Sequence, residues 1–371
     1  MTKMKLISLV PLSMAGAALA QVGGTGGAAV TTSNVSLFGV VDIAASWGKG
    51  DVADSTRLVQ GANTQSRVGF RGVEDLGGGV GAGFWLEAGV NADNGTGAAS
   101  NTNNQLLPAG ATPNNGAGGL TFNRRSTVSL LSRFGELRLG RDYVATYRNR
   151  DQVDPFTTNG VGGNVADQLN ITPVTGVRAS NMIGYFLPGN LGGFFGEAQY
   201  FMGENPDNTV NDKDGSGYQA RLGWASGPFG IAAAYGVTRY ATTATIGDVT
   251  SWNVGGHWDF GFLRLMGGWY DDQMDSLVKV NAEGYLVGAV MPIGAGELKA
   301  SFSSYETDAA TNPTARKIAV GYVHNMSKRT AAYVTYAHLE NRGSAAASLA
   351  GSITAPGKNS DGIDVGLKHS F

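Results

Sequence analysis

The chain ends on Asp361-Gly-Ile-Asp-Val-Gly-Leu-Lys-His-Ser-Phe371, a stretch whose alternate residues differ in character. One parity carries the apolar side chains and the closing ring: Ile363, Val365, Leu367, His369 and Phe371. The other parity is small or polar: Gly362, Asp364, Gly366, Lys368 and Ser370. A period of two predicts a β-strand with two different faces. Strands of about 9–11 residues cross a bilayer at a steep tilt. The stretch therefore predicts one strand of a membrane barrel, with its apolar face toward lipid and its polar face toward a lumen.

Residues 1–20 have the organisation of a secretory signal peptide. Lys3 and Lys5 form a basic start, and the apolar stretch that follows closes on Ala18-Leu-Ala20. That stretch is short and rich in small residues, so an uncleaved membrane anchor is the less favoured alternative. We expect an exported mature chain of residues 21–371 that forms a single barrel domain. Loss of the two lysines leaves 25 basic residues against 29 acidic ones and changes the net charge from −2 to −4.

The composition allows a membrane protein only if it is built from strands. Charged residues make up 15% of the chain and the mean hydropathy is −0.09, which is too polar for a bundle of spanning helices. No apolar run after residue 20 approaches the roughly 20 residues that a spanning helix needs. In a barrel only every second residue meets lipid. The chain contains no cysteine, so an exported protein of this kind must be stabilised by something other than disulfides, such as the closed edges of a barrel.

The sequence lacks the marks of a nucleic-acid-binding protein or an enzyme. Its net charge is small and it has no basic run, which argues against a nucleic-acid partner. The four histidines are scattered without metal-ligand spacing, and no nucleophile or phosphate-binding motif is present. The glycines of residues 77–81 have no following Lys-Ser/Thr and predict a tight turn instead. We expect no enzymatic activity, no metal and no cofactor.

The connections between the alternating segments indicate the fold. Sixteen segments are expected to be strands: residues 34–47, 65–74, 80–90, 121–131, 134–140, 178–187, 193–200, 218–225, 229–240, 251–258, 263–270, 284–290, 297–305, 315–323, 330–339 and 361–371. Short Gly/Pro/Asn turns alternate strictly with longer polar loops, at residues 49–64, 91–120, 141–177, 203–217, 241–250, 271–283, 307–314 and 340–360. This rhythm is typical of outer-membrane barrels, with short periplasmic turns and long external loops. The sequence predicts an all-β fold, a 16-stranded antiparallel transmembrane β-barrel.

Two further features concern the wall and the lumen of this barrel. Aromatic residues lie near strand ends and are expected to form girdles at the membrane interfaces; examples are Phe84, Phe186, Phe201, Trp269, Tyr270, Tyr333 and Phe371. A ring of this size encloses water, so selectivity requires a constriction with fixed charge. The third long loop, residues 141–177, mixes charged and aromatic residues and is expected to fold inward.

Several motifs resemble those of the general-diffusion porins of β-proteobacteria. They are Ser36-Leu-Phe-Gly-Val-Val-Asp42, Ser66-Arg-Val-Gly-Phe-Arg-Gly-Val-Glu-Asp-Leu-Gly-Gly-Gly79, Phe84-Trp-Leu-Glu87, Arg124-Arg-Ser-Thr-Val-Ser-Leu130, Phe134-Gly-Glu-Leu-Arg-Leu-Gly-Arg-Asp142, Gly321-Tyr-Val-His-Asn-Met-Ser-Lys-Arg-Thr330 and Gly366-Leu-Lys-His-Ser-Phe371. The resemblance covers essentially the whole mature chain, and it is greatest to the anion-selective group. It implies a homotrimer of outer-membrane barrels, surrounded by lipid, that small anions and hydrophilic solutes cross by passive diffusion.

The same resemblance implies the residues of the pore constriction. Its basic cluster would consist of Arg67, Arg124 and Arg178, with Glu87 as the acidic wall residue and Asp154 in the inward loop. Arg124 and Arg125 differ in parity, so only one can point squarely inward unless a strand edge intervenes. The loop also departs from the family by carrying four extra charges, namely Asp142, Arg148, Arg150 and Asp151, which leaves the local charge balance open.

Two other functions remain compatible with the same barrel. A substrate-specific channel would have a solute-binding track along its lumen, and liposome swelling with a series of solutes would separate it from a general channel. A structural or adhesin barrel would use the long external loops and would not conduct after reconstitution.

Overall fold

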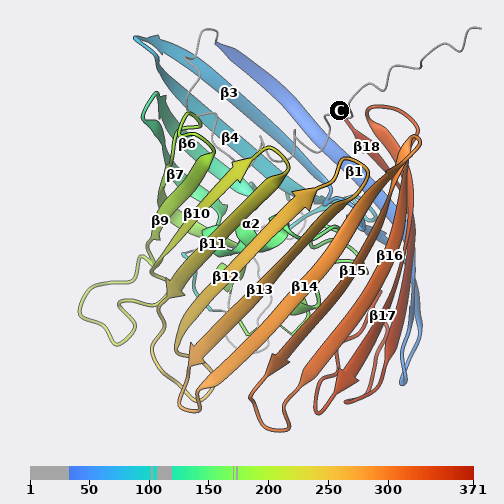
Figure 1. The fold of residues 1–371 in the computed structure, drawn as a ribbon. Coiled ribbons are helices and arrows are strands. Elements are labelled where there is room, and N and C mark those ends of the chain that lie inside the picture. The colour runs from blue at the N-terminus through green and yellow to red at the C-terminus, as the bar shows by residue number, and fades with distance from the viewer. Residues whose placement is uncertain (1–32, 102, 107–118, 170, 173) are drawn as a thin grey trace, which may run out of the picture.

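The computed structural model describes residues 33–101, 103–106, 119–169, 171–172 and 174–371, which form one antiparallel barrel (Figure 1). The expected signal peptide lies outside these ranges. The strands are β1 (Asn34–Lys49), β2 (Ser55–Gln60), β3 (Arg67–Gly77), β4 (Val80–Asn91), β5 (Thr96–Gly97), β6 (Arg125–Ser132), β7 (Gly135–Tyr143), β8 (Arg178–Phe186), β9 (Phe194–Phe201), β10 (Gly217–Ser226), β11 (Phe229–Thr238), β12 (Asp248–Asp259), β13 (Arg264–Asp275), β14 (Val280–Ile293), β15 (Gly296–Thr307), β16 (Thr314–Asn325), β17 (Thr330–Arg342) and β18 (Ser360–Ser370).

The barrel is closed by its first and last strands. β18 pairs with β1 in antiparallel register, from Val40 opposite Ser370 to Lys49 opposite Asp361. Within the described ranges, β2 and β3 lie one after the other along the same edge of β1, and the two-residue β5 pairs only with β4. Sixteen strands therefore make up the ring, and the predicted 16-stranded antiparallel barrel is confirmed.

The final strand has the two faces that its sequence predicts. Val365 and Leu367 are 46% and 52% exposed on the outer face, whereas Asp364 is only 1% exposed inside. Phe371 exchanges two backbone hydrogen bonds with Gly39, each 3.1 Å long. A Cβ atom at Gly39 would overlap the Phe371 ring, so the glycine provides the space that the ring occupies. The last residue is thus integrated into the closing seam.

The girdle prediction is wrong for part of the aromatic set. Phe186, Phe201, Tyr270 and Tyr333 are almost fully buried and point into the barrel. The reason is geometric, because successive side chains of a strand point to opposite faces. In the pair Trp269-Tyr270 only one ring can therefore face lipid. Other rings of the set, including Phe84 and Phe371, do lie exposed on the outer face.

The connections confirm the short–long rhythm with two corrections. Short turns lie at the end of the barrel that carries the C-terminus, and long loops lie at the opposite end (Figure 1). The three glycines 77–79 adopt positive φ angles of 82°, 62° and 78°, as a tight turn requires. The expected loop 49–64, however, contains β2, and residues 61–66 interrupt the paired edge between β2 and β3. The expected loop 91–120 contains the short β5.

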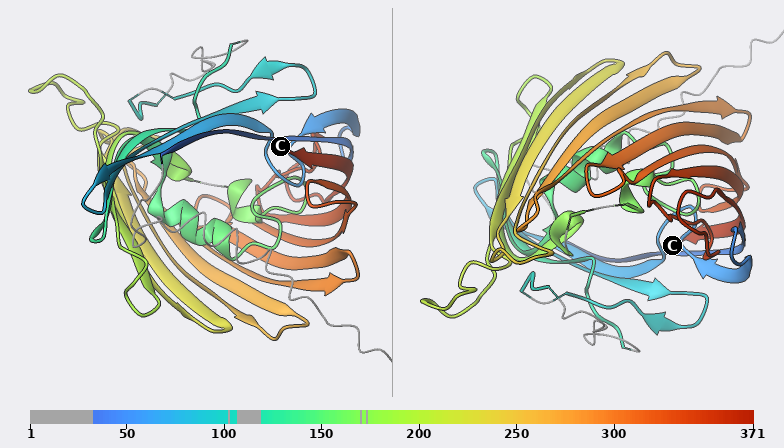
Figure 2. Two further views of the ribbon diagram at one scale, coloured as in Figure 1. Left: turned by 90° about the horizontal axis from the view of Figure 1, so that it is seen from above. Right: turned by 90° about the horizontal axis from the view of Figure 1, so that it is seen from below.

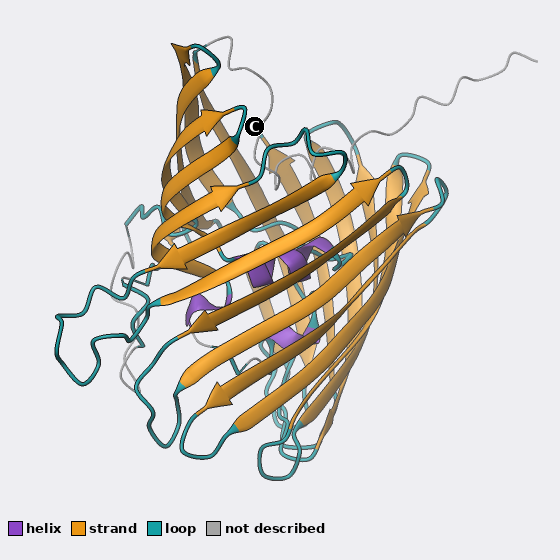
Figure 3. Cartoon of the chain, turned by 60° about the vertical axis from the view of Figure 1, so that its left-hand side comes forward, coloured by secondary structure: helices purple, strands orange, loops and turns teal. Residues whose placement is uncertain are grey.

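The third loop, residues 144–177, is called L3 below, and it lies inside the barrel (Figures 2 and 3). It contains helix α2 (Ala145–Gln152) and the 3-10 turns η1 (Val165–Asp167) and η2 (Val174–Gly176). No helix in the described ranges is long and apolar enough to cross a membrane. The polar loop L3 thus lies across the lumen of the barrel, as Figures 2 and 3 show.

Candidate pore constriction

The wall of the barrel caps the helix of L3. The first amides of any helix lack partners within the helix, and Val144 before α2 offers no side-chain cap. The backbone amide of Ala145 instead donates to Gln199 Oε1 at 2.9 Å, and that of Thr146 donates to Gln219 Oε1 at 3.0 Å. Both glutamines point inward from β9 and β10. A helix that is polar on all sides is thus fixed against the wall by hydrogen bonds rather than by an apolar face.

The tip of L3 is organised around Asp154, which is 2% exposed. Its Oδ1 accepts the backbone N–H of Phe156 at 2.8 Å, and its Oδ2 accepts those of Thr158 and Asn164, both at 2.9 Å. The carboxylate therefore binds the turn from within. None of the contacts of Asp154 in the described residues is with the predicted arginines, and its membership of the pore constriction stays a prediction.

The tip crosses the lumen to the opposite wall. Phe156 packs in a buried cluster with residues of β14 to β17, including Ala319 and Leu339. The backbone N–H of Val161 donates to Asp364 Oδ2 at 2.9 Å, and Ser46 Oγ donates to the other oxygen of that carboxylate at 2.6 Å. The polar face of the final strand thus holds the end of L3 at the seam of the barrel.

Residues 61–66 form a second inward element beside this tip. Asp42 Oδ2 accepts the backbone N–H groups of Asn63 and Thr64, at 3.3 and 2.8 Å. Gln65 Nε2 donates to Asn159 Oδ1 of L3 at 3.0 Å. The interrupted strand therefore supports the loop from the side, a role that the sequence did not predict because the segment reads as an ordinary Gly/Asn turn.

The three predicted arginines lie in one cluster with Glu87. Arg124 Nε lies 2.5 Å from Glu87 Oε1, and Arg67 Nε lies 3.7 Å from the same oxygen. Arg124 Nη2 and Arg178 Nη2 both donate to the Tyr143 hydroxyl, at 2.8 and 2.6 Å. We call these five residues the neck cluster. It contains three guanidinium groups and one carboxylate.

Tyrosines link the neck cluster to L3. The Arg178 guanidinium lies 4.1 Å from the centre of the Tyr143 ring, and that ring stacks on Tyr147 of α2 with centroids 5.2 Å apart. The Tyr147 hydroxyl is 2.6 Å from Thr158 Oγ1 at the tip. A cavity of about 260 Å³ lies between the neck cluster and L3, lined in part by Arg124, Tyr143, Tyr147 and Arg178. The spacing Tyr143-x-x-x-Tyr147 at a helix start is the signal that could have indicated this stack.

A second group of charges, the wall cluster, is balanced. Its members are Arg125, Glu136, Arg138, Asp142, Arg148 and Glu197. Asp142 Oδ2 lies 2.6 Å from Arg138 Nη1 and 2.7 Å from Arg148 Nη2. Arg125 contacts the same carboxylate at 3.7 Å, and Glu197 lies 3.5 Å from Arg148. Three cations thus face three anions. Arg124 precedes β6 while Arg125 lies within it, so the strand edge lets both side chains point inward.

The remaining extra charges of L3 are Arg150 and Asp151, and Arg150 has a local partner. Arg150 Nη2 lies 2.6 Å from Asp167 Oδ1 within the loop. Burial, together with the charges of Asp154 and Asp167, raises the pKa of Asp151 to about 6. L3 thus contains Arg150 against Asp151, Asp154 and Asp167, whereas positive charge exceeds negative charge in the neck cluster.

The model of the family described as "Gram-negative porin" matches residues 6–344 of the chain. The chain belongs to this family. Outer membrane porin protein 32 of Delftia acidovorans is 33% identical to this porin over 393 residues, covering 100% of both chains. An outer membrane porin protein of Bordetella pertussis (strain Tohama I) is 26% identical over 379 residues, covering 87% of this chain and 93% of the relative.

A solved structure shares the architecture over nearly the whole chain. The anion-selective porin from Comamonas acidovorans matches this porin with a TM-score of 0.78 at 31% identity, over 92% of this chain and 100% of that one. The resemblance drawn from the motifs is thereby confirmed, as is the location in the Gram-negative outer membrane. This porin forms a water-filled channel through which small hydrophilic solutes diffuse passively.

The carboxylate of Asp154 offers a direct test of how L3 is shaped. In the variant Asp154→Asn an amide N–H₂ faces one of the backbone N–H groups, which should weaken the turn by about 1–3 kcal/mol. We expect single-channel recordings to show a broader distribution of conductance with a higher mean. The matched control is Asp308→Asn, because Asp308 accepts the amide of Asn281 in an exposed turn outside the lumen. An unchanged distribution for Asp154→Asn would contradict the assignment.

Proposed function

We propose that this porin prefers anions and that the neck cluster sets the preference. The supporting observation is the charge imbalance of that cluster, where Arg67 and Arg124 share the carboxylate of Glu87 and Arg178 joins them through the Tyr143 hydroxyl. The wall cluster contributes no net charge. The name of the related Comamonas protein, an anion-selective porin, supports the same preference. In this proposal Asp154 acts by fixing the L3 turn that narrows the neck.

Arginine suits this task physically. Its guanidinium is charged at every working pH and offers several donors in a fixed plane, so anions can pass from one group to the next. A fixed positive charge in a narrow, low-dielectric neck raises the local concentration of anions and repels cations. The effect weakens as salt shortens the Debye length. We propose no catalytic role for any of these residues.

The triple variant Arg67→Gln, Arg124→Gln and Arg178→Gln tests the proposal. One unit charge about 8 Å from an ion changes its energy by about 0.5 kcal/mol in water. Loss of three charges therefore changes the energies of anion and cation by about 1.5 kcal/mol each, in opposite directions. Because salt screens part of this effect, the anion-to-cation permeability ratio should fall by at least roughly ten-fold. The measurement is the reversal potential of a planar bilayer in a potassium chloride gradient. The reversal potential should move toward the equilibrium potential of potassium.

A control of equal charge change is available in the same chain. Arg133, Arg329 and Arg342 have exposed side chains at turns or strand ends, and their replacement by Gln should leave the reversal potential nearly unchanged. If the neck variant also keeps its reversal potential, the neck cluster does not set the selectivity. If both triple variants shift it equally, the net charge of the whole barrel is responsible instead.

We further propose that residues 1–20 are removed on export and that the mature barrel, residues 21–371, assembles as a homotrimer. The basic start and the Ala18-Leu-Ala20 stretch support the first point, and the family resemblance supports the second. Protein purified from outer membranes should begin at Gln21 by N-terminal sequencing and should have the mass of three chains by light scattering. A retained Lys3 or a monomeric mass would contradict the respective proposal.

A further inference from the structure

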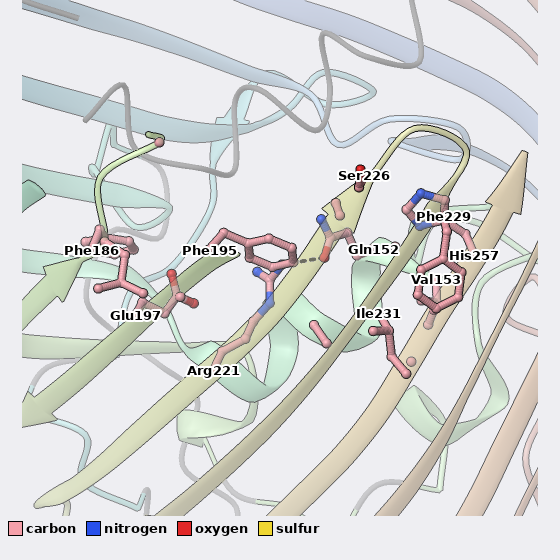
Figure 4. Close-up of a pocket in the computed structure, with 18 of the residues that line it drawn as sticks. Gln152, Val153, Phe186, Phe195, Glu197, Arg221, Ser226, Phe229, Ile231 and His257 are labelled. Atoms are coloured by element: carbon pink, nitrogen blue, oxygen red, sulfur yellow. Dashed lines mark hydrogen bonds between the residues drawn. The ribbon is translucent and has the colours of Figure 1, made fainter. Parts of the chain in front are cut away.

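A separate cavity lies on the short-turn side of L3 (Figure 4). Its volume is about 310 Å³, and it lies between the end of α2 and the wall of β8 to β12. The wall is built from small residues here, such as Gly230, Ala232 and Gly255, which leaves the space open. Volumes of about 300 Å³ are at the lower end of the range for small-molecule sites. The residues used below are Gln152, Val153, Phe195, Glu197 and Arg221.

Arg221 brings a buried positive charge to this cavity. Its side chain is 5% exposed and makes no ion pair within the described part of the chain. Its Nη2 donates to the neutral amide oxygen of Gln152, and its Nε has no hydrogen-bond partner there. Glu197 is the cross-strand neighbour of Arg221, but its carboxylate also lies 3.5 Å from Arg148. One carboxylate is thus shared by two buried guanidinium groups, and a buried charge is costly without a partner of its own. A further anion would therefore stabilise Arg221.

The apolar walls of the cavity indicate which chemical group could accompany an anion bound to Arg221. The Arg221 guanidinium lies 4.9 Å from the centre of the Phe195 ring, which itself covers Gly223. Val153 at the end of α2 lies opposite the wall glycines, since a Cβ atom at Gly255 would be 2.9 Å from its methyl group. Figure 4 shows the Phe195 ring beside the Arg221 and Gln152 side chains. A flat apolar body therefore finds contacts next to the cation.

We propose that this cavity binds small organic monoanions with a flat apolar body, for which benzoate is the probe. The carboxylate pairs with Arg221, and the ring packs between Phe195 and Val153. Glu197 lines the same cavity, and its Oε1 has no hydrogen-bond partner among the described residues. Its charge repels a second negative charge and thus disfavours dianions. The proposal deepens the proposed function, because it rests on the chain being an open channel and names one solute class that is retained during passage.

The test is a conductance titration of the wild-type porin in planar bilayers at constant chloride. Benzoate added on the short-turn side should reduce the ion current at a concentration about ten-fold lower than acetate, which lacks the ring. Benzamide lacks the charge and phthalate carries two, so both should also require about ten-fold higher concentrations. Equal half-blocking concentrations for benzoate and acetate would overturn the inference.

Two variants test whether benzoate reduces the ion current by binding in this cavity. Phe195→Ala and Arg221→Gln should each raise the half-blocking concentration of benzoate about ten-fold, because one removes the ring contact and the other the charge-assisted hydrogen bond. The matched control is Phe194→Ala, because the neighbouring ring lies on the outer face and is 53% exposed. An equal effect of Phe194→Ala, or no effect of Phe195→Ala, would overturn the site. If Arg221→Gln does not fold, the Phe195→Ala variant and the series of ligands show whether the cavity binds benzoate.

The result is separable from that for the proposed function. If the channel is selective for chloride but benzoate and acetate block it equally, the proposal for the neck cluster stands and the proposal for the cavity is refuted. If the barrel does not conduct, the channel function is refuted. Binding of benzoate to the cavity would then be measured by ligand-observed NMR on detergent-solubilised protein. Saturation transfer to benzoate that Phe195→Ala removes would support the site, and its absence in wild type would overturn it.

Discussion

The structure depends on one constraint, which is that a polar loop must be held across the inside of a wide barrel. Sixteen strands enclose more space than their side chains can fill, and an unsupported loop in that space would remain in water. L3 is retained because its backbone donors meet acceptors fixed on the wall. Gln199 and Gln219 cap the start of α2, and Asp364 accepts the amide of Val161 at the far side. The apolar contacts of Phe156 add to these hydrogen bonds.

This anchoring also determines where charge remains. The arginines of the wall cluster are balanced as a group, because Arg125, Arg138 and Arg148 face Glu136, Asp142 and Glu197, and Arg150 of L3 pairs with Asp167. Paired buried charges produce little field in the lumen. The neck cluster differs because it contains three guanidinium groups and one carboxylate, and Tyr143 positions two of these groups without adding charge. In this account, structural and selective arginines are distinguished by the net charge of the cluster to which they belong rather than by their location inside the barrel.

Much of the fold was predictable from the sequence because a barrel imposes simple rules. Parity predicted that Asp364 points inward and Leu367 outward, and the short–long rhythm of turns predicted the strand number. The same rule of parity was not applied to neighbouring aromatic residues, so Tyr270 was wrongly expected at the lipid interface. The inward segment 61–66 was missed because its support comes from Asp42, which is distant in the sequence. The proximity of Arg67, Arg124 and Arg178 came from the family resemblance, since no local pattern links three distant strands.

Amide hydrogen exchange of L3 tests most directly whether the loop keeps a fixed fold that is held in the lumen. The amides of Thr158, Val161 and Asn164 donate to Asp154 or Asp364, so their exchange should be slowed to rates that approach those of the barrel strands. Mass spectrometry of peptides covering residues 154–165, in detergent-solubilised protein, would provide the rates. Exchange as fast as that of the exposed loop residues 207–212 would show that L3 is not anchored and would contradict this account.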